Sequence, residues 1–332
     1  MVDIYKGRTT KEYTDWYRSA PQEILIETVG PCNLRCIGCP QALEEYPKEK
    51  WHPAFMDFDL YKSILEQTKE LWKPINVGLY HTGEITLLPH EKFDLYTKTA
   101  KEILRTDEGW DSVGFYTNGL LLDAERRSSV IRNKIDWVRL SFDGGDKASY
   151  DAVRIGSDFD TVRGNALAFA RESAAAGRSM RLEIIFVPYT ENENTVDQFH
   201  ALWEGTGWNH YTGGTMNYGG LMTEAVEKRR HVGQKVRRPR YSVPCPRIFE
   251  QFAVLVDGRV SACSADPMGI HVLGDLTKQT IKEVWEGDRM SSKGIIAAHT
   301  QGLAGNVSPC DKCDYTDYCA VPDGDFFGEW NP

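Results

Sequence analysis

The eight cysteines of this 332-residue chain lie in two groups, and their distribution limits how the chain can fold. Three lie between residues 32 and 39, none lies between 40 and 244, and five lie between 245 and 319. In a reducing compartment, clustered cysteines are more often metal ligands than disulfides. The pattern therefore predicts two separate metal-binding regions with a cysteine-free body between them.

The first group is Cys32, Cys36 and Cys39, whose spacing is C-x3-C-x2-C. A four-iron cluster that only transfers electrons is normally held by four cysteines. Three thiolates on one short loop therefore leave one iron open to bind another ligand. A zinc site or a disulfide loop is the alternative that the spacing leaves open.

Composition narrows the class of protein. Hydrophobic residues make up 41% and charged residues 26%, as in globular proteins, and 332 residues can form one large domain and a smaller one. The formal net charge of −9 argues against a nucleic-acid-binding protein. There is no apolar run of membrane-spanning length, and the first residues lack a signal-peptide core. We therefore expect a cytoplasmic protein with no nucleic-acid or membrane partner.

Short apolar strands alternate with segments of helical periodicity between residues 22 and 220. The expected strands cover 23–28, 75–80, 112–116, 137–142 and 181–188. The expected helices cover 59–72, 91–105, 124–133, 159–177 and 195–206. This alternation predicts an α/β fold with a parallel sheet of about six βαβ units, too few for a closed eight-fold barrel. The stretch 209–222, rich in Gly, Tyr, Asn and Thr, is expected to be a substrate-lining loop.

Polar turns follow the expected strands in a characteristic order. After the cysteines come Thr-Gly-Glu at 82–84, Thr-Asn-Gly at 117–119 and Ser-Phe-Asp-Gly at 141–144. The order resembles the partial (β/α)6 TIM barrel of the radical S-adenosylmethionine (SAM) superfamily. The resemblance covers most of the chain. It implies a 4Fe-4S cluster on the three cysteines, with an open iron that binds the amine and carboxylate of SAM.

The resemblance also implies SAM-binding residues. In the family, a Gly-Gly-Glu-Pro-like turn holds the SAM amine, and here that turn reads Thr-Gly-Glu-Ile at 82–85. Gly83 and Glu84 are retained, and Glu84 is the expected acceptor for the ammonium group. The positions that match contacts to the SAM ribose or carboxylate are Asn118, Ser141 and Arg154. The alternatives are an ordinary turn pair at Asn118-Gly119 and a simple strand end at Ser141.

The second group of cysteines surrounds a predicted β-hairpin. Cys245 and Cys263 flank the apolar stretch 252–260 with its Asp-Gly turn, and C-x2-C-x5-C follows at Cys310, Cys313 and Cys319. The arrangement resembles the auxiliary-cluster domains of radical SAM enzymes, called SPASM with two clusters and Twitch with one. Five cysteines suffice for one cluster. We therefore expect a Twitch domain with a second 4Fe-4S cluster on Cys245, Cys263, Cys310 and Cys313.

Other ligand sets stay open: Cys319 in place of one of the four, Asp323 as a ligand of a second site, or a zinc site of four cysteines. The expected division is an N-terminal extension at 1–21, the barrel at 22–226, a basic linker at 227–241 and the auxiliary-cluster domain at 242–332. The basic run 228–240 is expected to be solvated. Its alternative role is contact with an anionic substrate or a flavodoxin-type reductant.

The resemblance implies that SAM is cleaved to a 5′-deoxyadenosyl radical, which removes a hydrogen atom from the substrate. A second cluster suggests an electron acceptor. At a carbon that bears a hydroxyl group, loss of the proton to a base and of the electron to that cluster leaves a ketone, as in 2-deoxy-scyllo-inosamine dehydrogenase. His81, beside the Gly-Glu turn, is the candidate base. We expect an oxidoreductase for a small polar substrate of aminosugar or aminocyclitol type, with a flavodoxin- or ferredoxin-type reductant.

Three other functions fit the same motifs. A sugar epimerase would return a hydrogen atom from a thiol, and Cys319 is then the donor, because the body of the chain has no cysteine. A ribosomal-peptide-modifying enzyme usually has an added leader-binding domain, for which the stretch before the first strand is short. The third is an iron–sulfur or zinc protein that only binds a partner and does not cleave SAM. In such a protein Glu84, Asn118 and Ser141 would have no common function.

Overall fold

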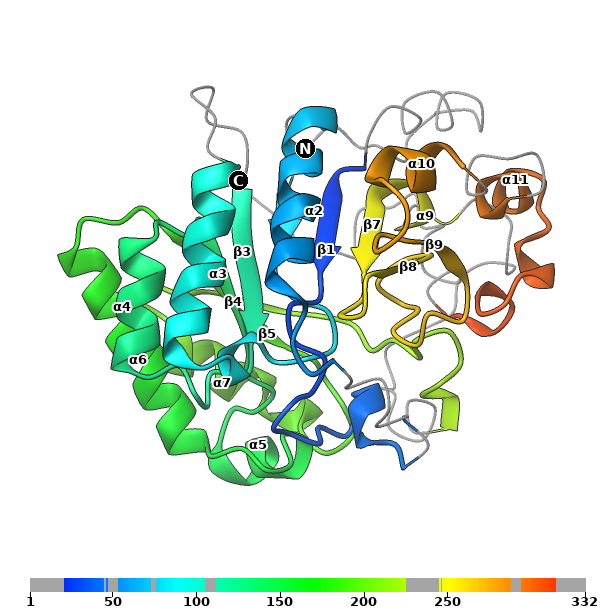
Figure 1. Ribbon diagram of the computed structural model, residues 1–332. Helices are drawn as coiled ribbons and strands as arrows, with labels where there is room; N and C mark the ends of the chain where they lie inside the picture. Colours follow the sequence, from blue (N-terminus) through cyan, green and yellow to red (C-terminus); the bar gives the residue numbers. More distant parts are fainter. Residues whose placement is uncertain are drawn as a thin grey trace, which may run out of the picture.

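A computed structural model describes residues 21–44, 46, 53–72, 76–104, 112–224, 245, 247–287 and 294–314. Within these residues, strands and helices alternate from β1 (Glu23–Ile26) to β6 (Asn209–Thr212), and a smaller segment of strands and helices follows (Figure 1). The α/β fold predicted from the alternation is confirmed. No helix in the described part of the chain has both the length and the apolar character that crossing a membrane requires.

Helices connect the successive parallel strands. Between β1 and β6 the strands are β2 (Asn76–Gly78), β3 (Ser112–Thr117), β4 (Trp137–Ser141) and β5 (Arg181–Phe186). The helices are α2 (Phe58–Leu71), α3 (His90–Ile103), α4 (Ala124–Arg132), α5 (Lys147–Val153), α6 (Phe159–Ala175) and α7 (Val196–Trp203). Short 3-10 turns occur at η1 (Pro40–Ala42), η3 (Ile85–Leu87) and η4 (Glu193–Thr195). Aspartates begin four of these helices by accepting first-turn amides: Asp57, Asp123, Asp146 and Asp158.

One sheet runs through both parts of the described chain, in the order β6-β5-β4-β3-β2-β1-β7-β8-β9. Strand β1 pairs in parallel with β2 on one side and with β7 (Gln251–Val254) on the other. Strands β8 (Arg259–Ser261) and β9 (Val272–Asp275) add to it antiparallel and complete the expected hairpin. In Figure 1, β7 therefore lies directly beside β1, and β8 and β9 follow beyond it. Short helices complete this part: α9 (Arg247–Glu250), α10 (Ile281–Glu286), α11 (Ile295–Thr300), η6 (Ala304–Asn306) and η7 (Cys310–Lys312).

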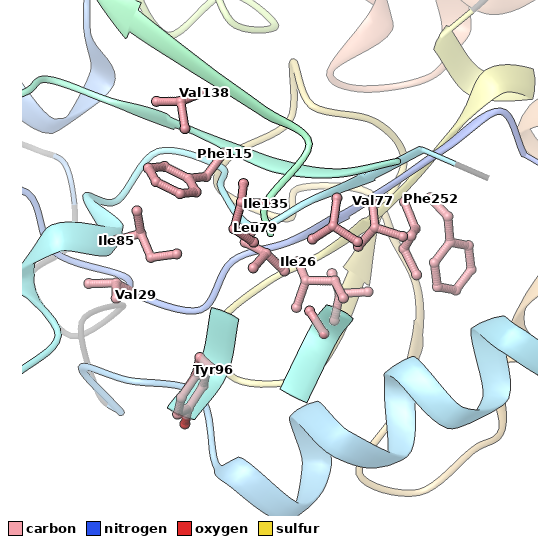
Figure 2. Close-up of a cluster of buried hydrophobic side chains, with 14 of the residues drawn as sticks. Ile26, Val29, Val77, Leu79, Ile85, Tyr96, Phe115, Ile135, Val138 and Phe252 are labelled. Carbon is pink, nitrogen blue, oxygen red and sulfur yellow. The ribbon is translucent and has the colours of Figure 1, made fainter. Parts of the chain in front are cut away.

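The two faces of the sheet differ because alternate residues of a strand point to opposite sides. On the outer face, buried apolar side chains from successive strands form one core with helices α2, α3, α4 and α6. Figure 2 shows part of this core, including Ile26, Val77, Leu79, Phe115 and Val138. This face carries most of the hydrophobic burial and holds the strand ends in place.

The inner face is polar and aromatic, and it is partly open to solvent. Arg139 donates from Nη2 to Oε2 of Glu183 at 2.7 Å, and its guanidinium lies over the rings of Tyr116 and Tyr211 at 4.7 and 5.5 Å. The Arg139 side chain is 22% exposed, whereas Val138 on the outer face is 0% exposed. The inner face is therefore the face of the sheet that a polar ligand can reach.

Two elements depart from the sequence-based expectation. Asn209–Thr212 forms β6, paired with the edge of β5, instead of being part of a loop. Its side chains are exposed or half-buried and show no apolar alternation, so the pairing follows from the free edge of β5 and not from a local pattern. Helix α5 was also not expected, and it places Arg154 at its C-terminal end.

Candidate functional site

The cysteine loop, residues 30–40, leaves the carboxyl end of β1 and is fastened there by Gln41. The N–H of Cys32 donates to Oε1 of Gln41 at 3.0 Å, and Nε2 of Gln41 donates to the carbonyls of Gly30 and Thr82 at 2.8 and 2.9 Å. Gln41 is only 2% exposed. One buried amide therefore ties both the start of the loop and its first cysteine to the turn after β2.

The other side of the cysteine loop lies against the C-terminal end of α5. The N–H of Arg35 donates to the carbonyl of Ile155 at 2.9 Å, and the N–H of Ile37 donates to the carbonyl of Val153 at 3.1 Å. Arg154 lies between these two contacts and is 8% exposed. Its Nη1 donates at 3.2 Å to Oδ2 of Asp143, just beyond the end of β4.

The three thiols of the loop are half-buried and interact electrostatically with one another. Burial is the main cause that raises the pKa of Cys32 to about 11 and that of Cys39 to about 12, and it also raises the pKa of Cys36. The positive charge of Arg154 acts in the opposite direction on all three. Metal ligation requires thiolates, so cluster binding at this loop would release protons.

The donor set of the loop fits a cluster. Among the described residues, no three His, Cys, Asp or Glu side chains converge closely enough to hold one metal ion. The loop offers three half-buried cysteine thiols, and cysteine thiolates are the ligands that hold iron–sulfur clusters. These donors fit the cluster that the resemblance implies.

Glu84 joins the ends of β2 and β3 below the cysteine loop. Its Oε1 accepts from the N–H and the hydroxyl of Thr86 at 3.1 and 2.6 Å and from the hydroxyl of Thr117 at 2.8 Å. Its Oε2 accepts from the N–H of Asn118 at 2.7 Å. Oε1 thus accepts three donors and Oε2 only one, so Oε2 is the oxygen with room for a further donor, such as the ammonium group that the resemblance implies.

Asn118 lies at the cysteine loop, whereas Ser141 lies apart from it. Nδ2 of Asn118 donates to Oδ1 of Asn33 at 2.8 Å and lies 3.8 Å from Sγ of Cys32. Ser141 ends β4, where it pairs with Ile185 of β5. Its hydroxyl makes no hydrogen bond within the described part of the chain. Of these two expected SAM contacts, only Asn118 is brought against the cysteines.

Gly83 allows a close approach of two backbone segments. A Cβ atom at this position would lie 1.7 Å from the carbonyl oxygen of Val29. The adjacent N–H of Glu84 donates to the carbonyl of Pro31 at 3.0 Å. The turn after β2 is thus packed on the start of the cysteine loop, which gives Gly83 a structural role besides the SAM contact expected for it.

We expect Gly83→Ala to lower the thermal midpoint and the iron content of the reconstituted protein. The added methyl group must displace backbone, which costs about 1–3 kcal/mol. Calorimetry and iron per chain measure both effects. Gly164→Ala in α6 is the control, because its Cβ meets nothing within 4 Å and alanine favours a helix. If the two variants had equal midpoints and equal iron contents, this packing argument would be wrong.

Glu27 and His81 form a buried pair at the ends of β1 and β2. Oε1 of Glu27 accepts from the N–H and hydroxyl of Thr82 at 3.2 and 2.9 Å, and Oε2 accepts from the N–H of Val256 at 3.1 Å. Nδ1 of His81 lies 3.6 Å from Oε1 of Glu27, and the imidazole is 1% exposed. Among the described residues, neither ring nitrogen has a hydrogen-bond partner. Sequence reasoning missed Glu27. The signal that could have found it is a carboxylate at the end of an apolar strand, directly before the cysteine loop.

Four cysteines of the second group come together, and they are called the C-terminal cysteine group here. The pKa of Cys263 is raised well above its ordinary value by burial and then by Cys245, Cys310 and Cys313. Burial, and after it Cys245 and Cys313, also raise the pKa of Cys310. All four are at most 8% exposed. Three residues or segments singled out in the sequence lie outside the described residues: Cys319, Asp323 and the basic run 228–240.

Three consecutive residues after β6 connect the two groups of cysteines. Met216 packs against two members of the C-terminal cysteine group. Asn217 and Asp314 exchange hydrogen bonds between their backbone N–H groups and side-chain oxygens, at 2.9 and 3.1 Å. The buried phenol of Tyr218, whose φ is 49°, interacts electrostatically with Cys39. The expected substrate-lining loop therefore lies between the two sites.

Comparison with known families agrees with this arrangement. The model of the radical SAM superfamily matches residues 26–202, which is more than half of the chain. The model of SPASM, an iron–sulfur cluster-binding domain, matches residues 245–314 and so includes the whole C-terminal cysteine group. No curated protein matches the chain.

Solved structures of similar fold include three enzymes. BtrN in complex with AdoMet and 2-DOIA has a TM-score of 0.56 at 18% identity, and the match covers 89% of this chain and 93% of BtrN. For anSMEcpe with bound AdoMet the TM-score is 0.59 at 17% identity, covering 90% and 88% of the two chains. SuiB of Streptococcus suis bound to precursor peptide SuiA has a TM-score of 0.62 at 13% identity, and the match covers 93% of this chain and 73% of SuiB. At these identities the likeness concerns the fold alone.

The geometry and the family matches lead to one assignment. The matched barrel contains Cys32, Cys36 and Cys39 at the carboxyl end of β1, and the matched C-terminal part contains four buried thiols beside it. The cofactors are accordingly SAM with a 4Fe-4S cluster in the barrel and further iron–sulfur in the C-terminal part. The chain belongs to the radical SAM superfamily, and its C-terminal part matches the SPASM iron–sulfur cluster-binding domain, whose match does not fix whether one or two clusters are held.

Proposed function

We propose that this chain is a radical SAM oxidoreductase that dehydrogenates an alcohol carbon of a small polar substrate, of aminosugar or aminocyclitol type. The observation that carries the proposal is the C-terminal cysteine group, because the pairing of β1 with β7 puts a second cluster at a fixed position beside the barrel. BtrN, whose structure contains AdoMet and 2-DOIA, supports it, since the fold match covers 93% of that protein.

The cofactors and the protein have different roles in the proposed reaction. When bound, SAM and the clusters supply the one-electron chemistry, which removes a hydrogen atom from the substrate carbon and accepts the electron left when the hydroxyl proton departs. The protein holds the clusters on buried loops, keeps water from the site and takes up the proton. The inner face of the sheet, with Tyr116, Arg139 and Tyr211, offers hydrogen bonds and aromatic surface to a polar ring.

His81 is the proposed proton acceptor. Two ring nitrogens that are buried with no hydrogen-bond partner among the described residues cost free energy, about 1–3 kcal/mol each, and a ligand hydroxyl would relieve that cost at one of them. Glu27 lies on the Nδ1 side at 3.6 Å and would stabilise the imidazolium that forms. Nε2 is then the nitrogen that receives the hydroxyl proton.

A substrate screen tests the proposed reaction. We expect the reconstituted protein, given SAM and dithionite, to convert a member of a panel of aminosugars and aminocyclitols that includes 2-DOIA. The product should be two mass units lighter than the substrate, with one 5′-deoxyadenosine formed per product. A product of unchanged mass that takes up solvent deuterium would establish an epimerase instead, with Cys319 as the candidate donor.

His81→Gln should lower product formation about 100-fold or more while 5′-deoxyadenosine is still made, because loss of the base affects only the step after hydrogen-atom removal. Mass spectrometry of product and nucleoside in the same reaction measures the ratio. His90→Gln is the control, because His90 bonds to Asp123 at the outer helices. A wild-type ratio in His81→Gln would exclude His81 as the base.

Peptide modification is the second candidate function. The fold matches to anSMEcpe and to SuiB with its precursor peptide have TM-scores of 0.59 and 0.62, slightly above that of BtrN. The same assay with peptides in place of sugars separates the two candidates. Dithionite in these assays stands in for a flavodoxin- or ferredoxin-type reductant, which is the protein partner that we propose.

A further inference from the structure

Arg154 is held in one position beneath the cysteine loop. The loop contacts the backbone on both sides of it, through Val153 and Ile155. Its Nη1 donates to Asp143 at 3.2 Å, and the side chain is 10% exposed. Among the described residues, its Nε has no hydrogen-bond partner although it is buried. A buried cation that is only partly paired is costly unless negative charge lies nearby.

The charge of Arg154 acts on the whole cysteine loop. Burial raises the pKa of Cys32, Cys36 and Cys39, and the charge of Arg154 opposes this rise at all three, whereas Asp143 and Glu84 add to it at Cys36. The guanidinium is protonated at any physiological pH. The positive charge of Arg154 therefore favours the thiolate forms of the three cysteines that would hold the cluster. The carboxylates of Glu84 and Asp143 act in the opposite direction.

Asp143 is the partner that keeps Arg154 in place. Its Oδ1 accepts the N–H of Val187 at 2.8 Å and its Oδ2 accepts from Arg154, as an ionised carboxylate does. Asn192 donates from Nδ2 to the backbone carbonyl of Asp143 at 3.0 Å. Asp143 is thus anchored in the loops after β4 and β5, and through it Arg154 has a second attachment besides the contacts with the cysteine loop.

We propose that Arg154, positioned by Asp143, sets the reduction potential of the 4Fe-4S cluster on the cysteine loop by stabilising its reduced state. Reduction adds one electron and therefore one negative charge, with no bond formed or broken, and the electron comes from the external reductant. Cluster potentials depend on nearby charge, hydrogen bonds and exposure to solvent. A charge acts strongly in a buried site because the effective dielectric constant is low there. This role does not depend on the substrate.

A redox titration followed by electron paramagnetic resonance tests the proposal on the reconstituted full chain without SAM. The signal of the loop cluster is the one that is missing from protein with alanine at Cys32, Cys36 and Cys39. We expect Arg154→Gln to shift its midpoint to more negative potential by about 59 mV or more, which lowers the ratio of reduced to oxidised cluster tenfold at a fixed potential. Arg154→Lys keeps the charge and should shift the midpoint by less than half as much.

Asp143→Asn supplies the opposite expectation. Asparagine has the same shape as aspartate and keeps an oxygen that can accept from Arg154, so the substitution removes a negative charge near the loop without removing the arginine, and the midpoint should become more positive. General loosening of the fold cannot produce shifts of opposite sign in the two variants. Arg127→Gln is the control, because Arg127 is an equally buried arginine paired with Glu172 at 2.8 Å, away from the cysteines. Its midpoint should equal that of the wild type.

Two results would overturn the proposal. The first is an unchanged midpoint in Arg154→Gln together with weaker SAM binding, which would assign Arg154 to the SAM carboxylate only. The second is a shift in the same direction in Arg154→Gln and Asp143→Asn. If Arg154→Gln fails to take up the cluster, the Arg154→Lys and Asp143→Asn midpoints decide the question. Failure to dehydrogenate any substrate would affect none of these measurements.

Discussion

Alanine at Cys32, Cys36 and Cys39 together should lower the iron content of the anaerobically reconstituted protein from about eight to about four per chain and abolish SAM cleavage. The three thiols are the protein ligands that the loop offers, and the C-terminal cysteine group should fill as before. Iron and sulfide per chain, with 5′-deoxyadenosine assayed after addition of dithionite and SAM, measure both effects.

A control variant in the same loop makes this result specific. The Arg35 side chain donates from Nη1 to the loop carbonyls of Cys32 and Leu34 and is not a cluster ligand, so Arg35→Gln should keep both the iron and the SAM cleavage. If the triple variant retained all its iron, or if the wild type bound zinc and formed no 5′-deoxyadenosine, the loop would not be a SAM-cluster site.

Replacing Cys310 and Cys313 with alanine should remove the other four irons, about half of the total, and leave SAM cleavage intact. The substrate radical would then lack its electron acceptor, so we expect 5′-deoxyadenosine without the oxidised product. The thermal midpoint should also fall, because cluster binding contributes to the stability of a buried site. Iron content, nucleoside and product are measured on the same preparation.

Lys312 lies between the two cysteines, and Lys312→Ala is the matched control. Its backbone carbonyl, which accepts from Nδ2 of Asn217 at 2.8 Å, is unchanged by the substitution. Lys312→Ala should therefore keep the iron and the product. Loss of SAM cleavage in the double cysteine variant would mean that the two sites are not independent, and unchanged product formation would remove the electron-acceptor role.

Much of the fold was predictable because it follows from local patterns. Short apolar runs, each followed by a turn, predicted β1 to β5. Apolar residues at helical spacing predicted the helices between these strands. Two pairings could not be predicted in this way. Strand β6 is exposed on the edge of β5, and β7 pairs with β1 across more than 200 residues of sequence. Neither pairing leaves a periodic signal, because each depends on the shape of the assembled sheet.

The candidate site was also predictable only in part. The cysteines and the Gly-Glu turn were evident from spacing and from the strand ends that they follow. Gln41, Asp143 and Glu27 were not identified, because each is a single polar residue whose importance comes from partners far along the chain. Ser141 ends β4, and its contact with the SAM ribose or carboxylate stays a prediction.

The pairing of β1 with β7 has a consequence for protein engineering. A chain that ended before residue 245 would leave one side of β1 without its partner, and an unpaired strand edge promotes aggregation. The SPASM part is therefore not an interchangeable attachment. A chimera that exchanges auxiliary clusters between such enzymes should keep β7 with the barrel and join the new sequence in the turn before β8, at Asp257-Gly258.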